Sequence, residues 1–318
     1  MEYMIAAFNF AHHISNTMHR RHFLKTTPAL LGMAWEIRHL PAGRKKPLLS
    51  FSTLGCPQWS FEKIVQCAAD NGYQGIEIRG IQDQLDLPKC PEFSTPERIA
   101  ATRRLVEDRQ LRIVNLGASA QMHHADTAKR KTQLDEARRF IDLAEQLKCP
   151  FIRVFPDDLP ADQEENATLD LIIKGLAELG DHAKGSGVKV LLESHGKVVR
   201  SDLLLRIMEG AAHRQVGLVW DVYNMWSVTK ESPESAYKAL KKYIDHVHIK
   251  DAILADGKSR YVLPGKGEVP IKDAVKTLSK GGYKGFYSFE WEKRWHPEIE
   301  EPELALPHYP KEMLTYFK

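Results

Sequence analysis

Residues 188–193 read VKVLLE, an apolar run that ends on Glu193. Three further runs in the second half of the chain follow the same plan: VGLVWD (216–221), HVHIKD (246–251) and GFYSFE (285–290). They carry Asp221, His248 and Glu290 at or near their ends. Parallel strands that are buried on both faces appear as continuous apolar runs, so a charged residue at the end marks the point where the strand leaves the core.

The spacing of these four residues predicts a closed barrel. They lie 28, 27 and 42 positions apart, and each interval contains a helical pattern. A barrel of eight strand-helix units takes about 30 residues per unit. Four residues at the same point of consecutive units face one mouth of such a barrel, at the end where this fold keeps its chemistry.

The first half of the chain has the same alternation of strand and helix. Short β-rich runs occur at Leu48–Leu54, Gly75–Arg79, Arg112–Leu116 and Phe151–Phe155. Helical patterns follow at Ser60–Asn71, Pro96–Arg109, Thr132–Leu147, Leu169–Lys184, Leu203–Ala212, Ser235–Tyr243 and Ile271–Lys280. This alternation predicts an α/β fold, a single (β/α)8 TIM barrel over residues 48–318.

The composition is that of a globular protein with a large core. Apolar residues make up 43% and charged residues 27%, and no apolar run is long enough to cross a membrane. The net charge of +3 comes from residues 1–47, which hold seven Lys or Arg and two Glu, so the remainder is near −2. That balance disfavours duplex nucleic acid as a partner. The four cysteines have no metal or disulfide spacing, and we interpret them as packed thiols.

Residues 1–47 are expected to be a leader outside the barrel. His19–Lys25 (HRRHFLK) pairs two arginines ahead of the apolar segment Thr26–Trp35, as in a twin-arginine export signal. The segment is short and no clear cleavage site follows, so a disordered basic leader is the alternative. The first interpretation implies export to the periplasm and the second a cytoplasmic protein.

The residue types at the four strand ends favour one divalent metal ion. Two Glu, one Asp and one His form an oxygen-rich set that suits Mn²⁺, Mg²⁺ or Co²⁺, with Zn²⁺ as a further candidate. A metal-polarised carbonyl acidifies the neighbouring C–H, and a Glu that binds through one oxygen has a second oxygen to take the proton. Glu193 and Glu290 are therefore the expected acid/base pair. Any one such residue alone is more often a solvated strand end; the four together carry the hypothesis.

The chain also resembles a known family in an ordered series of motifs. These are STLGCPQWSFEKIVQCAADNGYQGIEIR (52–79), LLESHG (191–196), VWDVYN (219–224), HVHIKD (246–251), PGKGEVPI (264–271) and GFYSFEWEKRWHPEIEEPE (285–303). They resemble the sugar phosphate isomerase/epimerase family with the xylose isomerase-like TIM barrel. The resemblance implies a metal held by Glu193, Asp221, His248 and Glu290, with the two Glu as acid and base. It also selects His248 rather than His246 as the ligand.

Further residues are candidates for contact with a small-molecule sugar or polyol substrate. His195 matches a Glu-x-His element of the family and would bind a hydroxyl group. Side chains at other strand ends could bind hydroxyl, carboxylate or phosphate groups, and two aromatic rings could stack on a sugar, with ion pairing and packing as the alternatives. The full set of expected substrate contacts is His195, Glu77, Arg79, Arg153, Asn224, Lys250, Trp59 and Trp291.

Two positions depart from the pattern of ketose 3-epimerases. Those enzymes have a His three positions after the metal Asp and an Arg six positions after the metal His, where this chain has Asn224 and Leu254. The sequence therefore predicts a metal-dependent sugar isomerase or epimerase, and leaves the sugar and any homo-oligomer open. Alternatives are a lyase that dehydrates a keto-inositol or 3-keto sugar, an endonuclease IV-like phosphodiesterase, and a carbohydrate-binding barrel without catalysis.

Overall fold

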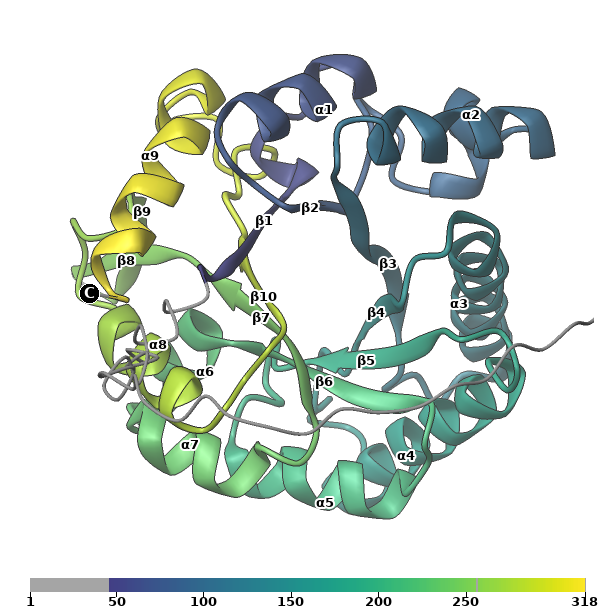
Figure 1. Ribbon diagram of the computed structural model, residues 1–318. Helices are drawn as coiled ribbons and strands as arrows, with labels where there is room; N and C mark the ends of the chain where they lie inside the picture. Colours follow the sequence, from purple (N-terminus) through teal and green to yellow (C-terminus); the bar gives the residue numbers. More distant parts are fainter. Residues whose placement is uncertain (1–45, 256, 318) are drawn as a thin grey trace, which may run out of the picture. The chain divides into compact units, whose positions relative to one another are not determined.

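The computed structural model describes residues 46–255 and 257–317, so the expected leader lies almost wholly outside the described residues. Eight parallel strands close into a barrel in the order β1-β10-β7-β6-β5-β4-β3-β2, with helices around it (Figure 1). The barrel strands are β1 (Leu48–Ser52), β2 (Gly75–Ile78), β3 (Arg112–Gln121), β4 (Phe151–Phe155), β5 (Lys189–Glu193), β6 (Val216–Asp221), β7 (Ile244–Ile249) and β10 (Phe286–Phe289).

The α-helices alternate with the barrel strands as the sequence predicts, and residues 222–229 and 302–315 form two further helices that were not predicted. They are α1 (Phe61–Asp70), α2 (Pro96–Glu107), α3 (Thr127–Leu147), α4 (Glu165–His182), α5 (Ser201–Ala211), α6 (Val222–Thr229), α7 (Pro233–Leu240), α8 (Ile271–Lys280) and α9 (Pro302–Thr315). Short 3₁₀ turns at Thr53–Gly55, Leu87–Lys89 and Pro91–Phe93 complete the loops after β1 and β2. None of the described helices is long and apolar enough to span a membrane.

Side-chain caps explain where several helices begin. Ser60, Thr95, Asp126 and Ser232 each accept a hydrogen bond from the backbone N–H three positions later, at the starts of α1, α2, α3 and α7. Such a cap satisfies one of the N–H groups that a helix leaves unpaired at its start. Pro follows the cap in α2 and α7, where its missing N–H costs nothing.

Several predicted boundaries were wrong, for identifiable reasons. The helix expected at Thr132 begins at Thr127, because its first turns are exposed and polar and carry no apolar repeat. The strand expected to end at Leu116 continues to Gln121 through small residues, which do not form an apolar run. The strand expected to end at Leu54 stops at Ser52 and passes into a 3₁₀ turn.

An antiparallel hairpin explains the long interval between His248 and Glu290. It consists of β8 (Asp251–Ala255) and β9 (Lys258–Val262), and the sequence analysis did not predict it. Asp251 accepts backbone hydrogen bonds from Gly265, Gly267 and Val269 at 2.9–3.2 Å. The last residue of the HVHIKD motif therefore fixes the loop that follows the hairpin, including the Gly-Lys-Gly segment.

The packing of the core leaves no room for side chains at particular points. Gly75 opens β2, and a Cβ atom there would lie 2.4 Å from Val114 Cγ1 and 2.8 Å from Phe286 Cε1.

Three cysteines, Cys56, Cys90 and Cys149, are buried and Cys67 is half-buried, all as free thiols. Burial raises the pKa of the Cys149 and Cys90 thiols to about 12. The interpretation of the cysteines as packed thiols agrees with these positions.

Candidate metal centre

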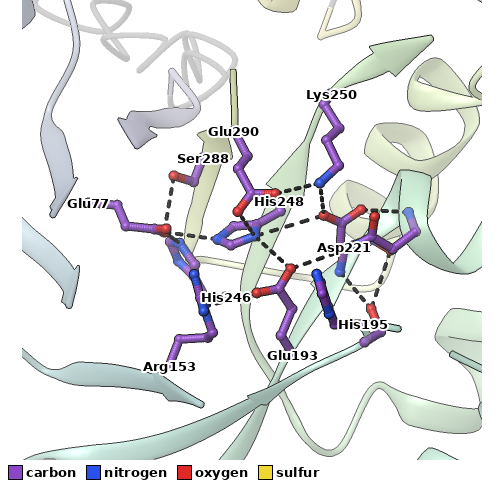
Figure 2. A network of polar contacts seen from close by, with 12 residues as sticks. Glu77, Arg153, Glu193, His195, Asp221, His246, His248, Lys250, Ser288 and Glu290 are labelled. Atoms are coloured by element: carbon purple, nitrogen blue, oxygen red, sulfur yellow. Dashed lines mark hydrogen bonds and ion pairs between the residues drawn. The ribbon is translucent and has the colours of Figure 1, made fainter. Parts of the chain in front are cut away.

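Glu193, Asp221, His248 and Glu290 meet at the carboxyl ends of β5, β6, β7 and β10 (Figure 2). Each offers one ligand atom, and these atoms all lie within 4.8 Å of one another. His248 Nδ1 is 3.3 Å from Glu290 Oε1, 3.5 Å from Glu193 Oε1 and 3.9 Å from Asp221 Oδ2. All four side chains are buried. We call these four residues the ligand cluster.

Asp221 is fixed in the ligand cluster by the start of α6. It is the N-cap of this helix, and its Oδ1 accepts a hydrogen bond from the Asn224 N–H at 2.7 Å. The backbone of Asp221 is held in turn by Ser194 Oγ, which accepts from its N–H at 2.9 Å. Oδ2 is left to face His248 and Lys250. Because α6 begins directly at the end of β6, Oδ1 of Asp221 caps the helix and Oδ2 is left to the ligand cluster.

Glu77 lies on the other side of the His248 ring from Asp221 (Figure 2). Its Oε2 is 2.9 Å from Nε2 of both His248 and His246, and Ser288 Oγ donates to the same oxygen at 3.4 Å. Burial alone raises the pKa of Glu77, but the two histidines outweigh burial and hold the pKa well below its usual range. Glu77 is fully buried and orients histidines, so its position does not favour the expected substrate contact.

Lys250 is surrounded by carboxylates. Its Nζ lies 2.5 Å from Glu290 Oε2, 2.6 Å from Glu292 Oε1 and 2.8 Å from Asp221 Oδ2. An ammonium group has three N–H donors, and here each has an acidic neighbour. The expected substrate contact of Lys250 is therefore less favoured than a role in holding two members of the ligand cluster.

Two buried arginines lie beside the ligand cluster. Arg153 Nε is 3.0 Å from Glu193 Oε2, and its Nη1 donates to the Ala118 carbonyl at 2.9 Å. Arg79 donates from Nη2 to Ser119 Oγ at 2.9 Å. Burial, followed by the charge of Arg153, lowers the pKa of Arg79 to about 9. Both arginines therefore lie near Glu193, and their contact with a substrate stays a prediction.

His195 forms a pair with Asp157, a residue that the sequence analysis did not select. His195 Nδ1 lies 2.8 Å from Asp157 Oδ1, and the ring stands 4.4 Å from the Phe155 ring between centroids. The Asp157 carbonyl accepts from the Lys197 N–H at 2.9 Å, and a Cβ at Gly196 would lie 2.0 Å from that carbonyl oxygen. The loops after β4 and β5 are thus closely joined, and Asp157 fixes the orientation of the His195 ring.

The remaining expected contacts divide into two groups. Asn224 lies in the site, where its side-chain amide donates to Glu193 Oε1 at 3.4 Å. Trp291 is fully buried, donates to the Glu300 carbonyl at 2.9 Å and stacks on Phe289. Trp59 is also buried, with Lys63 Nζ 4.0 Å from its ring centroid. These side-chain contacts of the two tryptophans are with residues outside the ligand cluster and favour the packing alternative.

Burial and neighbouring charges shift the pKa values of Asp221, His248 and Glu290 in different directions. Burial raises the pKa of Asp221 to about 7, although Lys250 acts against this shift. Burial disfavours a charged His248, but Glu290, Glu77 and Glu193 outweigh burial and raise its pKa well above the usual value. Glu290 keeps a low pKa because His248 and Lys250 outweigh its burial. The carboxylates thus favour a positively charged His248, in addition to the charges of Lys250 and Arg153 beside the ligand cluster.

The ligand cluster fits a divalent ion in size and chemistry. Ligands on opposite sides of a small divalent ion at about 2.1 Å lie about 4 Å apart, close to the spread of these atoms. His248 Nδ1 is buried and has no hydrogen-bond partner of acceptable geometry among the described residues. Glu77 accepts from Nε2, an arrangement that fixes the tautomer of metal-binding histidines and leaves Nδ1 as the donor to the metal.

The model of one protein family matches residues 65–309, and its description is a xylose isomerase-like TIM barrel. The chain belongs to this family. Its curated relatives include the fructoselysine 3-epimerase of Shigella flexneri, 23% identical over 84% of this chain and 95% of the relative. The inosose isomerase of Halalkalibacterium halodurans is 24% identical over 72% of this chain and 81% of the relative. These relatives are enzymes that act on sugars or sugar derivatives.

Dehydratases also occur among the relatives. The inosose dehydratase of Geobacillus thermodenitrificans is 29% identical, but the match covers 43% of this chain and 51% of that enzyme. Among solved structures, an IolI protein with a bound zinc atom has a TM-score of 0.72 at 18% identity, covering 85% of this chain and 97% of that one. A D-psicose 3-epimerase from Clostridium cellulolyticum has a TM-score of 0.67 at 14% identity, with 85% and 97% covered. These structural matches confirm the predicted fold class.

Proposed function

We propose that this protein is a divalent-metal-dependent isomerase or epimerase of a sugar or sugar derivative. The observation that carries this proposal is the ligand cluster, in which the four predicted residues meet within 4.8 Å at one end of a closed barrel. The epimerases and isomerases among the relatives support the class of reaction.

The four members of the ligand cluster would hold one metal ion, with Mn²⁺ as our first choice and Mg²⁺, Co²⁺ or Zn²⁺ as alternatives. A bound divalent ion would polarise a substrate carbonyl and make the adjacent C–H acidic. Three carboxylates leave this set rich in negative charge, which suits a neutral hydroxy-ketone as an added ligand. The structurally similar IolI protein contains a zinc atom, which supports the presence of a metal in this chain but not the identity of that metal.

The two Glu of the ligand cluster have different surroundings for their two oxygens. Oε1 of both Glu193 and Glu290 faces His248 Nδ1, whereas Oε2 faces Arg153 in one case and Lys250 in the other. The Oε2 atoms are the ones left for proton transfer. An arginine stays charged at all ordinary pH values, so Arg153 keeps Glu193 ionised and ready to act as a base.

Glu290 is then the partner that returns a proton, which its Oε2 would first take up from solvent or from Lys250, the donor that contacts this oxygen. The two carboxylates come from strands on either side of β6 and β7, so they approach a bound carbonyl compound from different directions. Removal by one and return by the other gives epimerisation, or isomerisation if the proton returns to the neighbouring carbon. His195, held by Asp157, is the proposed partner of a substrate hydroxyl group.

A dehydratase is the second candidate, and the partial matches to inosose dehydratases favour it. Dehydration begins with the same proton removal next to a carbonyl but then expels a hydroxyl group. Asn224 and Leu254 stand where ketose 3-epimerases have His and Arg, so the substrate contacts of those epimerases are not reproduced and a dehydratase stays compatible with the site. An endonuclease IV-like activity has less support, because Arg79 follows β2 and Ser119 lies in β3 where that activity would need histidine ligands.

The test is incubation of the Mn²⁺-loaded protein with ketoses, aldoses, inososes and 3-keto sugars in heavy water, followed by NMR. Deuterium at one carbon identifies the substrate and the reacting position, and loss of a hydroxyl group identifies a dehydratase. We expect exchange to be lost in Glu193→Gln and Glu290→Gln, and retained in Glu209→Gln, an exposed residue of α5. Absence of exchange across the panel would contradict the proposal and favour a carbohydrate-binding barrel.

A further inference from the structure

Arg79 is a buried cation without an acidic partner. It is only 5% exposed, and no carboxylate among the described residues lies within ion-pair distance of its guanidinium group. Its one side-chain hydrogen bond goes to the neutral Ser119, and its Nη1 has no partner. A buried charge without a counter-charge costs several kcal/mol and is rare in proteins.

The Arg79 side chain lies inside the barrel mouth, next to Arg153. Gly117 of β3 pairs in register with Arg153 of β4, so both present the same face to the interior. A Cβ at Gly117 would lie 2.6 Å from Arg79 Cδ and 3.1 Å from Arg153 Nη2. The missing side chain at Gly117 therefore leaves the space in which the two arginines meet.

The acidic residues nearby are engaged elsewhere. Glu193 is already paired with Arg153, and the nearby Glu136 accepts a hydrogen bond from the Ser119 N–H at 2.7 Å. A metal ion in the ligand cluster would neutralise Glu193 and Glu290 further. Glu136, Glu193 and Glu290 therefore act on the charge of Arg79 only from beyond ion-pair distance.

We propose that Arg79 and Arg153 form a binding subsite for an oxyanion group, a carboxylate or a phosphate, carried by the substrate. The inference rests on the proposed function for its claim that the anion belongs to a substrate. A guanidinium group offers parallel N–H donors that match carboxylate and phosphate oxygens. The free Nη1 of Arg79 would donate to such a group, and Arg153 would add a second positive charge. Such a subsite would select an acidic or phosphorylated sugar derivative as the substrate.

The lowered pKa of Arg79 agrees with this assignment. Burial and the neighbouring Arg153 both disfavour the charged form, and the carboxylates around the mouth do not restore it. An anion between the two guanidinium groups would relieve the repulsion between them. The same anion would have a fixed position relative to the ligand cluster, because Arg153 also contacts Glu193.

Three matched ketoses test the subsite: a neutral ketohexose, its 6-phosphate and the keto acid in which C6 is a carboxylate. We expect the metal-loaded protein to prefer one of the two anions by KM, and the preferred one distinguishes phosphate from carboxylate. Arg79→Met should raise KM for that anion about 10-fold to 100-fold more than it raises KM for the neutral ketose, as expected for a lost hydrogen bond to a charged group. Equal effects on all three substrates, or preference for the neutral sugar, would overturn the proposal.

A second measurement does not depend on catalysis. Acetate and sulfate should each be tested by calorimetry with the metal-loaded wild-type protein, with Arg79→Met, and with Arg98→Met, an exposed residue of α2, as the control. We expect an anion to bind the wild type and Arg98→Met more tightly than Arg79→Met. Anion binding without deuterium exchange on any sugar would contradict the proposed function but keep the subsite. Equal anion binding by all three proteins would remove the subsite, whatever the activity.

A second variant, which acts by steric displacement, keeps the proposal testable if Arg79→Met does not fold. Gly117→Ala places a methyl group where Arg79 Cδ and Arg153 Nη2 lie, so it should displace both arginines and weaken anion binding without removing a charge. Circular dichroism confirms that each variant is folded. If Gly117→Ala and Arg79→Met are both folded and both bind the anion as well as the wild type, the assignment is wrong.

Discussion

Glu77 Oε2 lies 2.9 Å from Nε2 of His248, on the side of the ring opposite the three carboxylates of the ligand cluster. This contact decides which ring nitrogen is available to a metal. With the proton held on Nε2, the lone pair of Nδ1 faces Glu193, Asp221 and Glu290. A buried carboxylate outside the ligand cluster therefore determines the chemistry of a residue inside it.

Glu77→Gln should weaken metal binding by about 10-fold to 100-fold, because a neutral amide no longer fixes the tautomer of His248 or raises the basicity of its Nδ1. The affinity for Mn²⁺ can be measured by competition with a chelator. Glu209→Gln, an exposed change of the same kind, should leave the affinity unaltered. If Glu77→Gln binds metal as tightly as the wild type, the orienting role assigned to Glu77 is incorrect.

Metal binding should strengthen as the pH rises through about 7. The metal takes the deprotonated carboxylate of Asp221, whose pKa burial raises to about 7, and the neutral ring of His248, whose pKa is also raised. Below that pH, protons compete with the metal at both groups; above it, the competition at Asp221 disappears and the competition at His248 continues. Calorimetry in buffers of different ionisation enthalpy should detect protons released on binding near neutral pH. An affinity that does not change between about pH 6 and 8 would contradict these shifts.

Lys250→Met should destabilise the metal-free protein more than the metal-loaded protein. Lys250 is the cation that contacts Asp221, Glu290 and Glu292, and loss of one partner of a buried ion pair costs about 3–5 kcal/mol. A bound divalent ion would replace part of that positive charge. The melting temperature should fall by several degrees without metal and by less with it. Equal falls in both states would show that Lys250 does not balance the charge of the ligand cluster.

Much of this architecture could be predicted from the sequence because the relevant residues stand at the ends of apolar runs. Glu193 and Asp221 close strands whose continuous apolar character predicts burial, so their carboxylates appear as interruptions. His248 is different. His246 and His248 are two positions apart on one strand face, and both lie 2.9 Å from Glu77, so spacing alone does not distinguish them.

Residues outside strand ends left no such signal. Asp157 lies in the loop after β4 at a φ of 65°, and its contact with His195 joins loops 38 positions apart in the chain. Glu292 follows β10 and pairs with Lys250 across 42 positions. The β8–β9 hairpin is half exposed, and its second strand, KSRYV (258–262), lacks an apolar run. These features depend on tertiary contacts, which a periodic pattern in the sequence does not encode.

Asp157→Asn should impair substrate binding through His195 without unfolding the protein. Asn tolerates the left-handed backbone conformation of this residue, so the fold should be kept. The neutral amide does not select protonation at Nδ1 of His195, and we expect a rise in KM with a smaller change in kcat. Nitrogen NMR of the His195 ring should show a changed tautomer population, which a purely structural role would not produce. An unchanged ring spectrum would refute the positioning role of Asp157.

The central claim is that the ligand cluster binds one divalent ion, and elemental analysis of the purified protein after dialysis against Mn²⁺ tests it most directly. We expect one metal ion per chain in the wild type and in Glu209→Gln, and far less than one in Asp221→Asn and His248→Ala, with all four proteins folded by circular dichroism. A wild type that retains no metal, or variants that retain as much as the wild type, would contradict it.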